Sequence, residues 1–188
     1  RLTSFKGDTK PLHVLSSAQQ KAYDEIDAAF DDKDCVLLHG VTSSGKTEVY
    51  THLIDKCIKE GKQVLYLLPE ISLTTQITQR LQSFFGDEVA VYHSKFSNNE
   101  RVEIWNRLKS DNPYKLVLGV RSSLFLPFNN LGLIIVDEEH EASFKQQNPA
   151  PRYNARDAAL VLANIYGAKC LLGSATPSIE SAFNAHKK

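Results

Sequence analysis

The sequence predicts an α/β fold in which helices cover both faces of a parallel sheet. Short apolar runs of β-forming residues alternate with longer stretches that have helical periodicity. The apolar runs are nearly continuous, which is typical of strands that are buried on both faces. With 188 residues, 42% of them hydrophobic and 23% charged, the chain is long enough for one hydrophobic core.

The elements can be assigned in order along the chain. Residues 1–14 are polar and unpatterned, and we interpret them as a linker from a preceding domain, with the folded domain at 15–188. A first helix should begin after a serine cap at Ser16 or Ser17 and end in the acidic turn 31–34. We expect strands at 35–38, 64–68, 89–92, 116–120, 131–136 and 169–172. Further helices are expected at 46–60, 73–85, 98–109 and 155–166, and from Ser178 onward.

The composition excludes some classes of protein. The 22 basic residues balance the 22 acidic ones, so net charge does not indicate a nucleic-acid partner, although a local basic surface remains compatible with it. No apolar run approaches the roughly 20 residues of a membrane-spanning helix, and the first residues do not form a secretory leader. We therefore expect a cytoplasmic protein without a membrane partner. The chain begins at Arg1 and contains no methionine, which suggests part of a longer protein.

Residues 40–47 match the phosphate-loop pattern G-x-x-x-x-G-K-[ST] between a predicted strand and a predicted helix. The loop amides and the start of the helix attract phosphate oxygens. Lys46 would neutralise the β and γ phosphates, and the Thr47 hydroxyl would bind Mg²⁺. An ordinary glycine turn is the alternative. The predicted cradle consists of Gly40, Val41, Thr42, Ser43, Ser44, Gly45, Lys46 and Thr47.

A second polar cluster, Asp137-Glu138-Glu139-His140, follows the apolar run 133–136. Grouping carboxylates after a buried strand costs folding free energy unless a cation or a proton transfer uses them. Asp137 would hold Mg²⁺ through a water molecule, and Glu138 would orient and deprotonate the attacking water. A solvated acidic strand end is the alternative interpretation.

The order of Gly-Lys-Thr, Asp-Glu-x-His and Ser174-Ala175-Thr176 resembles the first RecA-like domain of superfamily 2 helicases of the DEAH/DExH type. Further segments resemble the primosomal replication-restart helicases within that superfamily, and the resemblance covers roughly residues 15–185. These segments are 68–74, 93–105, 119–125, 145–157 and 173–178. The resemblance implies a RecA-like P-loop NTPase fold that binds ATP or ADP with Mg²⁺, as the motor of a 3′ to 5′ DNA helicase that restarts stalled forks.

The resemblance also implies roles for individual residues. Gln19 would bind the adenine edge, although a glutamine near a helix start is otherwise an ordinary surface residue. His140 would act with Lys46, Asp137 and Glu138 in catalysis. His140, together with Ser174, Ala175 and Thr176, would also couple the nucleotide state to the affinity for DNA.

Two groups of residues would contact DNA according to the same resemblance. The first contacts the phosphate backbone and consists of Thr74, Arg121 and Ser122; a surface salt bridge is the alternative for Arg121. The second belongs to an aromatic-rich loop that senses single-stranded DNA, for which a surface loop with one packed phenylalanine is the alternative. It consists of Phe144, Lys145, Arg152 and Tyr153.

Two positions depart from the family pattern. Ser43 stands where many members carry glycine, and Val120 replaces a threonine. The family's second RecA-like domain, its arginine finger and its zinc-binding cysteine cluster are absent from these 188 residues, so we expect zinc only in the other half of an intact protein.

The resemblance implies single-stranded and forked DNA, the second RecA-like domain, primosome proteins and single-strand-binding proteins as partners. The chain alone should bind Mg-ATP with little hydrolysis. Two alternatives remain open: the motor domain of another superfamily 2 DNA translocase, and a non-catalytic DNA-binding module that is switched by nucleotide.

Overall fold

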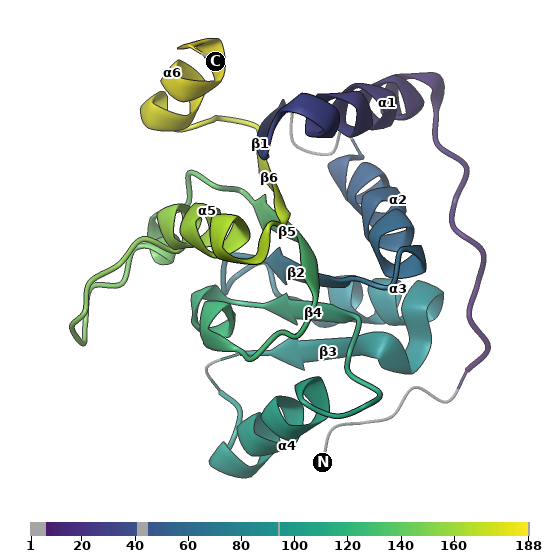
Figure 1. Cartoon of the computed structure of the whole chain (residues 1–188), viewed down its shortest axis with the longest axis vertical. Helices are drawn as coiled ribbons and strands as arrows, with labels where there is room; N and C mark the ends of the chain where they lie inside the picture. Colours follow the sequence, from purple (N-terminus) through teal and green to yellow (C-terminus); the bar gives the residue numbers. More distant parts are fainter. Residues whose placement is uncertain (1–6, 41–44, 94, 188) are drawn as a thin grey trace.

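The computed structural model describes residues 7–40, 45–93 and 95–187, and within these residues it contains one parallel sheet. The sheet has six strands in the order β1-β6-β5-β2-β4-β3 (Figure 1). The predicted fold class is confirmed, and each strand begins and ends within two residues of its predicted limits. The strands are β1 (Cys35–His39), β2 (Gln63–Leu67), β3 (Val89–Tyr92), β4 (Leu116–Gly119), β5 (Leu131–Asp137) and β6 (Lys169–Ser174).

Helices cover both faces of the sheet (Figure 1). One hydrophobic cluster joins one face to α1 (Ser17–Asp32), α2 (Lys46–Lys59) and α3 (Thr75–Phe85). A second cluster joins the other face to α4 (Asn98–Leu108) and α5 (Ala155–Tyr166). The last helix, α6 (Ile179–Lys187), lies near β1. Three short 3-10 helices complete the described part of the chain: η1 (Gly86–Glu88), η2 (Arg121–Phe125) and η3 (Ala142–Phe144).

Local capping explains where several helices begin. Ser16 and Gln19 form a capping box at α1, and Ser97 and Glu100 form the predicted capping box at α4. Thr74 caps α3 by accepting a hydrogen bond from the Ile77 amide, so this helix begins two residues later than predicted. These side chains satisfy amides that the first turn of a helix leaves unpaired.

Strand β1 departs from the expectation that the strands are buried on both faces. Its two end residues, Cys35 and His39, are exposed, and the three between them are half-buried. The reason is its place in the sheet, because β1 lies at the edge and pairs only with β6. The central strand β2, by contrast, is buried along its whole length.

The strand order brings three distant segments to one edge of the sheet. Strand β6 lies between β1 and β5, with His39 beside Ser174 and Asp137 beside Gly173. The Gly40 amide donates to the Ser174 carbonyl at 3.0 Å. A Cβ at position 173 would lie 1.8 Å from the Tyr50 hydroxyl, which explains the glycine there. The edge formed by the carboxyl ends of β1, β6 and β5 is therefore where ligands of a parallel sheet are expected.

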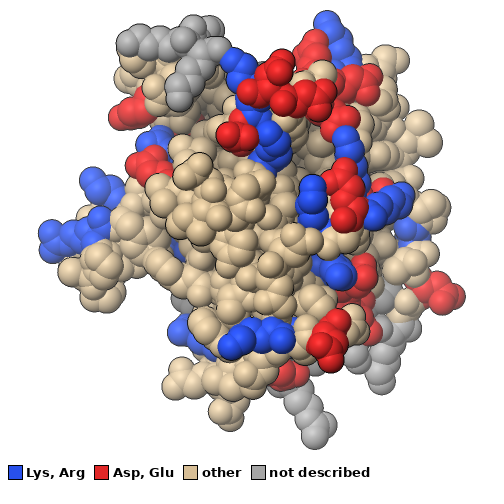
Figure 2. All heavy atoms as spheres, viewed as in Figure 1, with Lys and Arg blue, Asp and Glu red and all other residues tan. Residues whose placement is uncertain are grey.

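The numbers of basic and acidic residues are equal, but the two kinds of side chain are unevenly distributed over the surface. Acidic side chains gather over α1, and basic side chains stand at the margin where residues 145–153 project from the sheet (Figure 2). In that projecting loop, Lys145 and Arg152 are both exposed. None of the helices in the described ranges is long and apolar enough to cross a membrane.

Residues just before α1 pack against the domain. The Lys10 amide donates to the Ser83 carbonyl at 2.7 Å, and the His13 ring contacts the Phe84 ring edge-on at 5.3 Å. His13 also lies 3.3 Å from a carboxylate oxygen of Glu48. The interpretation of residues 1–14 as an interdomain linker stays a prediction.

Candidate nucleotide-binding site

The phosphate-loop lysine, Lys46, lies at the start of α2, and its side chain points toward Gly40. Its Nζ donates to the Gly40 carbonyl at 2.8 Å and lies 3.8 Å from a Glu138 carboxylate oxygen. Gly45 adopts the left-handed conformation before α2 and provides no side-chain cap. The helix therefore offers its first amides, together with the Lys46 ammonium, to an anion. The loop residues Val41, Thr42, Ser43 and Ser44 lie outside the described residues.

Gln19 connects α1 to this loop. Its side-chain oxygen accepts from the Ser16 amide at 2.8 Å, and its Nε2 donates to the Gly45 carbonyl at 3.3 Å. Gln19 thus lies against the phosphate loop, where a nucleotide-binding residue is expected. Its predicted contact with adenine stays a prediction.

A matched pair of substitutions measures the contact between Gln19 and the loop. Gly45 and Gly61 have similar positive φ angles of 79° and 76°, but a Cβ would lie 2.1 Å from Gln19 Nε2 at Gly45 and would meet nothing within 4 Å at Gly61. We expect Gly61→Ala to cost about 1–2 kcal/mol of backbone strain. Gly45→Ala should cost about 1 kcal/mol more, because Gln19 must leave its hydrogen bond, and should also weaken nucleotide binding.

Chemical denaturation and nucleotide titration of both variants check this expectation. The double variant Gln19→Ala/Gly45→Ala is the control, because it removes the clashing side chain and should recover part of the extra loss of stability. Equal losses in Gly45→Ala and Gly61→Ala, with equal nucleotide affinity, would contradict the expectation.

Two buried tyrosines hold the Asp137 carboxylate at the end of β5. Tyr50 on α2 donates to one oxygen at 3.2 Å, and Tyr66 on β2 donates to the other at 3.1 Å. Burial raises the pKa of Asp137, and the nearby Glu138 charge raises it further. Tyr66 also shares a hydrogen bond with the Thr47 side chain. Sequence reasoning missed both tyrosines, because only the strand order reveals that α2 and β2 face this carboxylate.

The Asp137 and Thr47 side chains suit a magnesium ion chemically. Carboxylate and hydroxyl oxygens are hard ligands of the kind that Mg²⁺ prefers. An ionised carboxylate offers about two acceptor sites on each oxygen. Tyr50 and the Glu138 amide, at 3.1 Å, occupy the sites of Asp137 Oδ1, whereas only Tyr66 donates to Oδ2 among the described residues. The Oδ2 atom therefore keeps one acceptor site for a water molecule.

Glu138 has a strained backbone and faces the lysine. Its φ of 52° lies in the left-handed region, which is uncommon for a residue other than glycine. One carboxylate oxygen lies 3.8 Å from Lys46 Nζ, and the other lies 3.8 Å from His140 Nδ1. Strain of this kind persists only where the surroundings hold the residue in place. The Glu138 carboxylate is only part-buried and could accept a proton from a water molecule.

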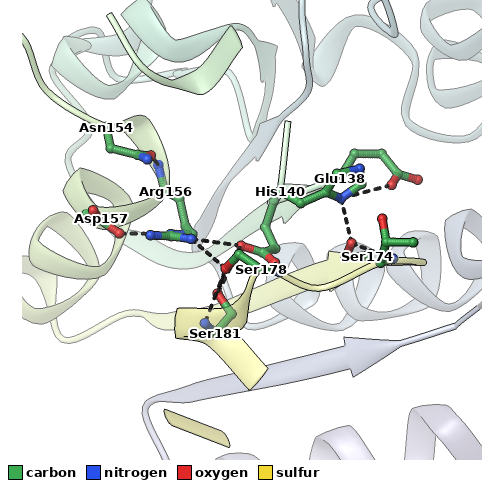
Figure 3. Close-up of polar contacts among 10 residues, drawn as sticks. Glu138, His140, Asn154, Arg156, Asp157, Ser174, Ser178 and Ser181 are labelled. Atoms are coloured by element: carbon green, nitrogen blue, oxygen red, sulfur yellow. Dashed lines mark hydrogen bonds and ion pairs between the residues drawn. The ribbon is translucent and has the colours of Figure 1, made fainter. Parts of the chain in front are cut away.

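Two of the predicted coupling residues, His140 and Ser174, lie beside the Glu138 carboxylate (Figure 3). Ser174 Oγ lies 2.7 Å from His140 Nδ1 and accepts from the Thr176 amide at 3.0 Å. The Ala175 carbonyl lies 3.2 Å from His39 Nε2. Since the Ser174 carbonyl also accepts from the Gly40 amide, hydrogen bonds join the start of the phosphate loop, the acidic turn and the Ser174–Thr176 segment. Their predicted role in coupling stays a prediction.

The residues predicted to contact DNA have different environments. Thr74 and the loop residues Lys145 and Arg152 are exposed, whereas Ser122 is half-buried. The Arg121 guanidinium donates to the carbonyls of Ser143 and Lys145 at 2.9 and 3.4 Å, so it anchors the projecting loop in this structure.

The two aromatic residues of the predicted DNA-sensing loop differ in accessibility. Tyr153 is half-buried, its hydroxyl donates to the Arg121 carbonyl at 3.4 Å, and its ring contacts exposed Phe125 edge-on at 5.3 Å. Phe144 is only 1% exposed and belongs to the hydrophobic core. A ring in that position cannot stack on a base, so the predicted DNA contact of Phe144 does not fit this structure.

Comparison with known proteins gives consistent matches. A family model described as DEAD/DEAH box helicase matches residues 16–184. Replication restart protein PriA of Bacillus subtilis is 44% identical over 181 residues, which are 95% of this chain and 22% of that protein. PriA of Haemophilus influenzae is 51% identical over 148 residues, which are 79% of this chain and 20% of that protein. The chain spans about a fifth of the length of these relatives.

Solved structures of similar fold include RecG bound to a three-way DNA junction, with a TM-score of 0.65 and 26% identity over 94% of this chain and 23% of that chain. The UvsW helicase from bacteriophage T4 has a TM-score of 0.59 and 17% identity, and it covers 92% of this chain and 56% of that chain. At that identity, the second match supports the fold alone.

Proposed function

The chain belongs to the DEAD/DEAH box helicase family, and from this premise we propose that it is the ATP-binding motor domain of a DNA helicase that restarts stalled replication forks. The observation that supports this most directly is the approach of Glu138 to Lys46, at 3.8 Å, beside the tyrosine-held Asp137. The identity of 44% and 51% to two PriA proteins supports the narrower assignment to replication restart.

Each residue of the site has a defined role in this proposal. Lys46 and the first amides of α2 bind the β and γ phosphates. Thr47 and Asp137 hold magnesium, and Lewis-acid stabilisation of phosphate charge is the chemistry that bound magnesium supplies. Glu138 orients the attacking water and takes its proton. His140, through its contact with Ser174, links the state of this site to the segment that follows β6.

The DNA-binding part of the proposal uses exposed and half-buried polar residues from three segments of the domain. Thr74 and Ser122 contact the phosphate backbone, and Lys145, Arg152 and Tyr153 contact a single strand through charge and ring stacking. Arg121 acts by holding the projecting loop that carries Lys145. We infer that these contacts position the strand without reading its sequence.

The intact protein would translocate 3′ to 5′ on single-stranded DNA in the cytoplasm. Its partners would be forked DNA, its own second RecA-like domain, primosome proteins and single-strand-binding proteins, with zinc bound only outside these residues. A fork-reversal translocase is the second candidate, and the 26% identity to RecG, whose solved structure is bound to a three-way DNA junction, favours it among the alternatives. An intact protein that reverses model forks but does not translocate 3′ to 5′ on single-stranded DNA would support this second candidate.

The isolated chain should bind Mg-ATP and hydrolyse it very slowly. A charge-stabilising arginine supplied from a second domain is worth about 10³ to 10⁵ in rate in phosphate-loop enzymes. Titration of the chain with a fluorescent ATP analogue, in magnesium and in EDTA, measures binding, and single-turnover assays with and without single-stranded DNA measure hydrolysis. Absence of magnesium-dependent ATP binding, or DNA-stimulated turnover above about 1 s⁻¹ by this chain alone, would contradict the proposal.

A further inference from the structure

Glu139, the third residue of the Asp-Glu-Glu-His turn, points away from the phosphate-loop lysine into a buried polar cluster. Its side chain is completely buried. One carboxylate oxygen accepts from the Ser178 amide at 2.6 Å. The other accepts from Ser181 Oγ at 2.9 Å, from Ser178 Oγ at 3.2 Å and from Arg156 Nη1 at 3.2 Å. A buried carboxylate is tolerated only when it is paired and hydrogen-bonded in this way.

Arg156 connects the projecting loop, residues 145–153, to the buried cluster around Glu139 (Figure 3). It is the second residue of α5, directly after the loop that the Lys145–Asn154 bridge closes. Asn154 caps the helix by accepting from the Arg156 amide at 2.9 Å. Burial by itself would lower the pKa of Arg156, but Asp157 and Glu139 raise it, so the guanidinium stays charged. The loop cannot shift its carboxyl end without moving this charge relative to Glu139.

The other donors come from the segment after Ser174–Thr176. Ser178 immediately precedes α6, and Ser181 lies in its first turn. Ser178 Oγ also accepts from Arg156 Nη1 at 2.7 Å, so the serine bridges the two charged groups. Glu139 is therefore the point where the acidic turn, the projecting loop and the start of α6 meet.

The same cluster constrains the backbone of Glu138. On one side of Glu138, Asp137 is held by two tyrosine hydroxyls. On the other side, the Glu139 amide donates to the Gly173 carbonyl at 3.1 Å, and the Glu139 carboxylate is fixed by its partners. The left-handed conformation of Glu138 is thus enforced by both neighbours. Loss of either anchor would let the carboxylate leave its position near Lys46.

We propose that Glu139 and Arg156 are positioning residues for ATP hydrolysis. They act through the backbone of Glu138, and they tie its placement to the projecting loop and to the segment after Ser174–Thr176. Neither residue touches the nucleotide. This inference rests on the proposed function, in which Glu138 activates water.

The test uses Glu139→Gln, which keeps the shape of the side chain and removes its charge. We expect single-turnover hydrolysis of saturating Mg-ATP to slow about tenfold, equivalent to about 1.4 kcal/mol in the barrier, with unchanged nucleotide affinity. Hydrogen exchange at the Glu139 amide should become faster, because its anchor is weakened. The double variant Glu139→Gln/Arg156→Gln pairs two neutral amides and should recover part of both losses. Arg156→Lys, which keeps the charge but loses the planar fork, tests the same contact if Glu139→Gln does not fold.

Asp157→Asn is the matched control. Asp157 binds the same guanidinium through Nε at 2.8 Å, but its side chain is 61% exposed, so its loss should change neither measurement. Wild-type hydrolysis and exchange in Glu139→Gln would overturn the inference, and so would an equal loss in Asp157→Asn. If the unsubstituted chain does not bind Mg-ATP, the proposed function fails, whereas the exchange measurement still decides whether Glu139 and Arg156 hold the turn.

Discussion

Replacing Lys46 with alanine should weaken the binding of Mg-ATP by about 30-fold to several thousandfold. The Lys46 side chain is only 9% exposed, so its ammonium would meet phosphate in a site that excludes most water. Removing one partner of such a charge pair costs about 2–5 kcal/mol, because the other charge loses its compensation. The substitution also removes the hydrogen bond to the Gly40 carbonyl, which ties the lysine to the start of the loop.

Titration with a fluorescent ATP analogue measures this loss, with Lys59→Ala as the control. Lys59 lies in the same helix, but its side chain is 74% exposed and pairs with Asp55 on the helix surface. We expect Lys59→Ala to bind nucleotide as the unsubstituted chain does. Wild-type affinity in Lys46→Ala would mean that the phosphate loop does not bind phosphate.

Replacing Glu138 with glutamine should leave nucleotide affinity within a few fold of normal and slow hydrolysis by about 10² to 10⁴. Glutamine keeps the size of the side chain and can occupy the same backbone conformation, but it cannot accept a proton from water. Single-turnover hydrolysis by the full-length protein with single-stranded DNA, together with nucleotide titration, separates the two effects. A large loss of affinity with unchanged single-turnover hydrolysis at saturation would assign Glu138 to nucleotide binding instead.

Glu141→Gln is the control for charge removal in the same turn. The Glu141 amide donates to the Glu138 carbonyl at 2.8 Å, so the two residues share one local structure. Its hydrolysis rate should stay normal. The two variants also distinguish a motor from a nucleotide-switched module. A module that only switches does not require Glu138, so Glu138→Gln and Glu141→Gln should respond to ATP equally.

Much of the fold was predictable because its determinants are local. The limits of α5 and β3 agree with the sequence prediction. The hydrophobic periodicity of each element and the residues that end it lie within a few residues of each other, so both can be identified from the local sequence. The capping box of Ser97 and Glu100 spans a single turn. The phosphate-loop pattern and the acidic turn after β5 could likewise be identified without knowing the strand order. Edge strand β1 was mispredicted as buried, because burial depends on which strands lie beside it.

Several site residues could not be predicted, since their partners are distant in sequence. Tyr50 and Tyr66 are 87 and 71 residues from Asp137, and nothing in their own segments indicates a carboxylate partner. For Phe144 the sequence left two interpretations open, a DNA-sensing aromatic and a packed phenylalanine in a surface loop. The fold decides for packing, because Phe144 of η3 joins the same hydrophobic cluster as α5. Nothing in the segment around Arg156 indicates Glu139 as its partner, and the fold places the two side chains 3.2 Å apart.

The sequence by itself therefore determined the elements, the phosphate-binding chemistry at Lys46 and the acidic chemistry at Asp137 and Glu138. Only the tertiary structure decided which side chains hold those groups in place. The physical reason is that helix and strand preferences act over a few residues, whereas the partners of Asp137 and Glu139 depend on β6 lying between β1 and β5 and on the packing of α2, α5 and α6 around that edge.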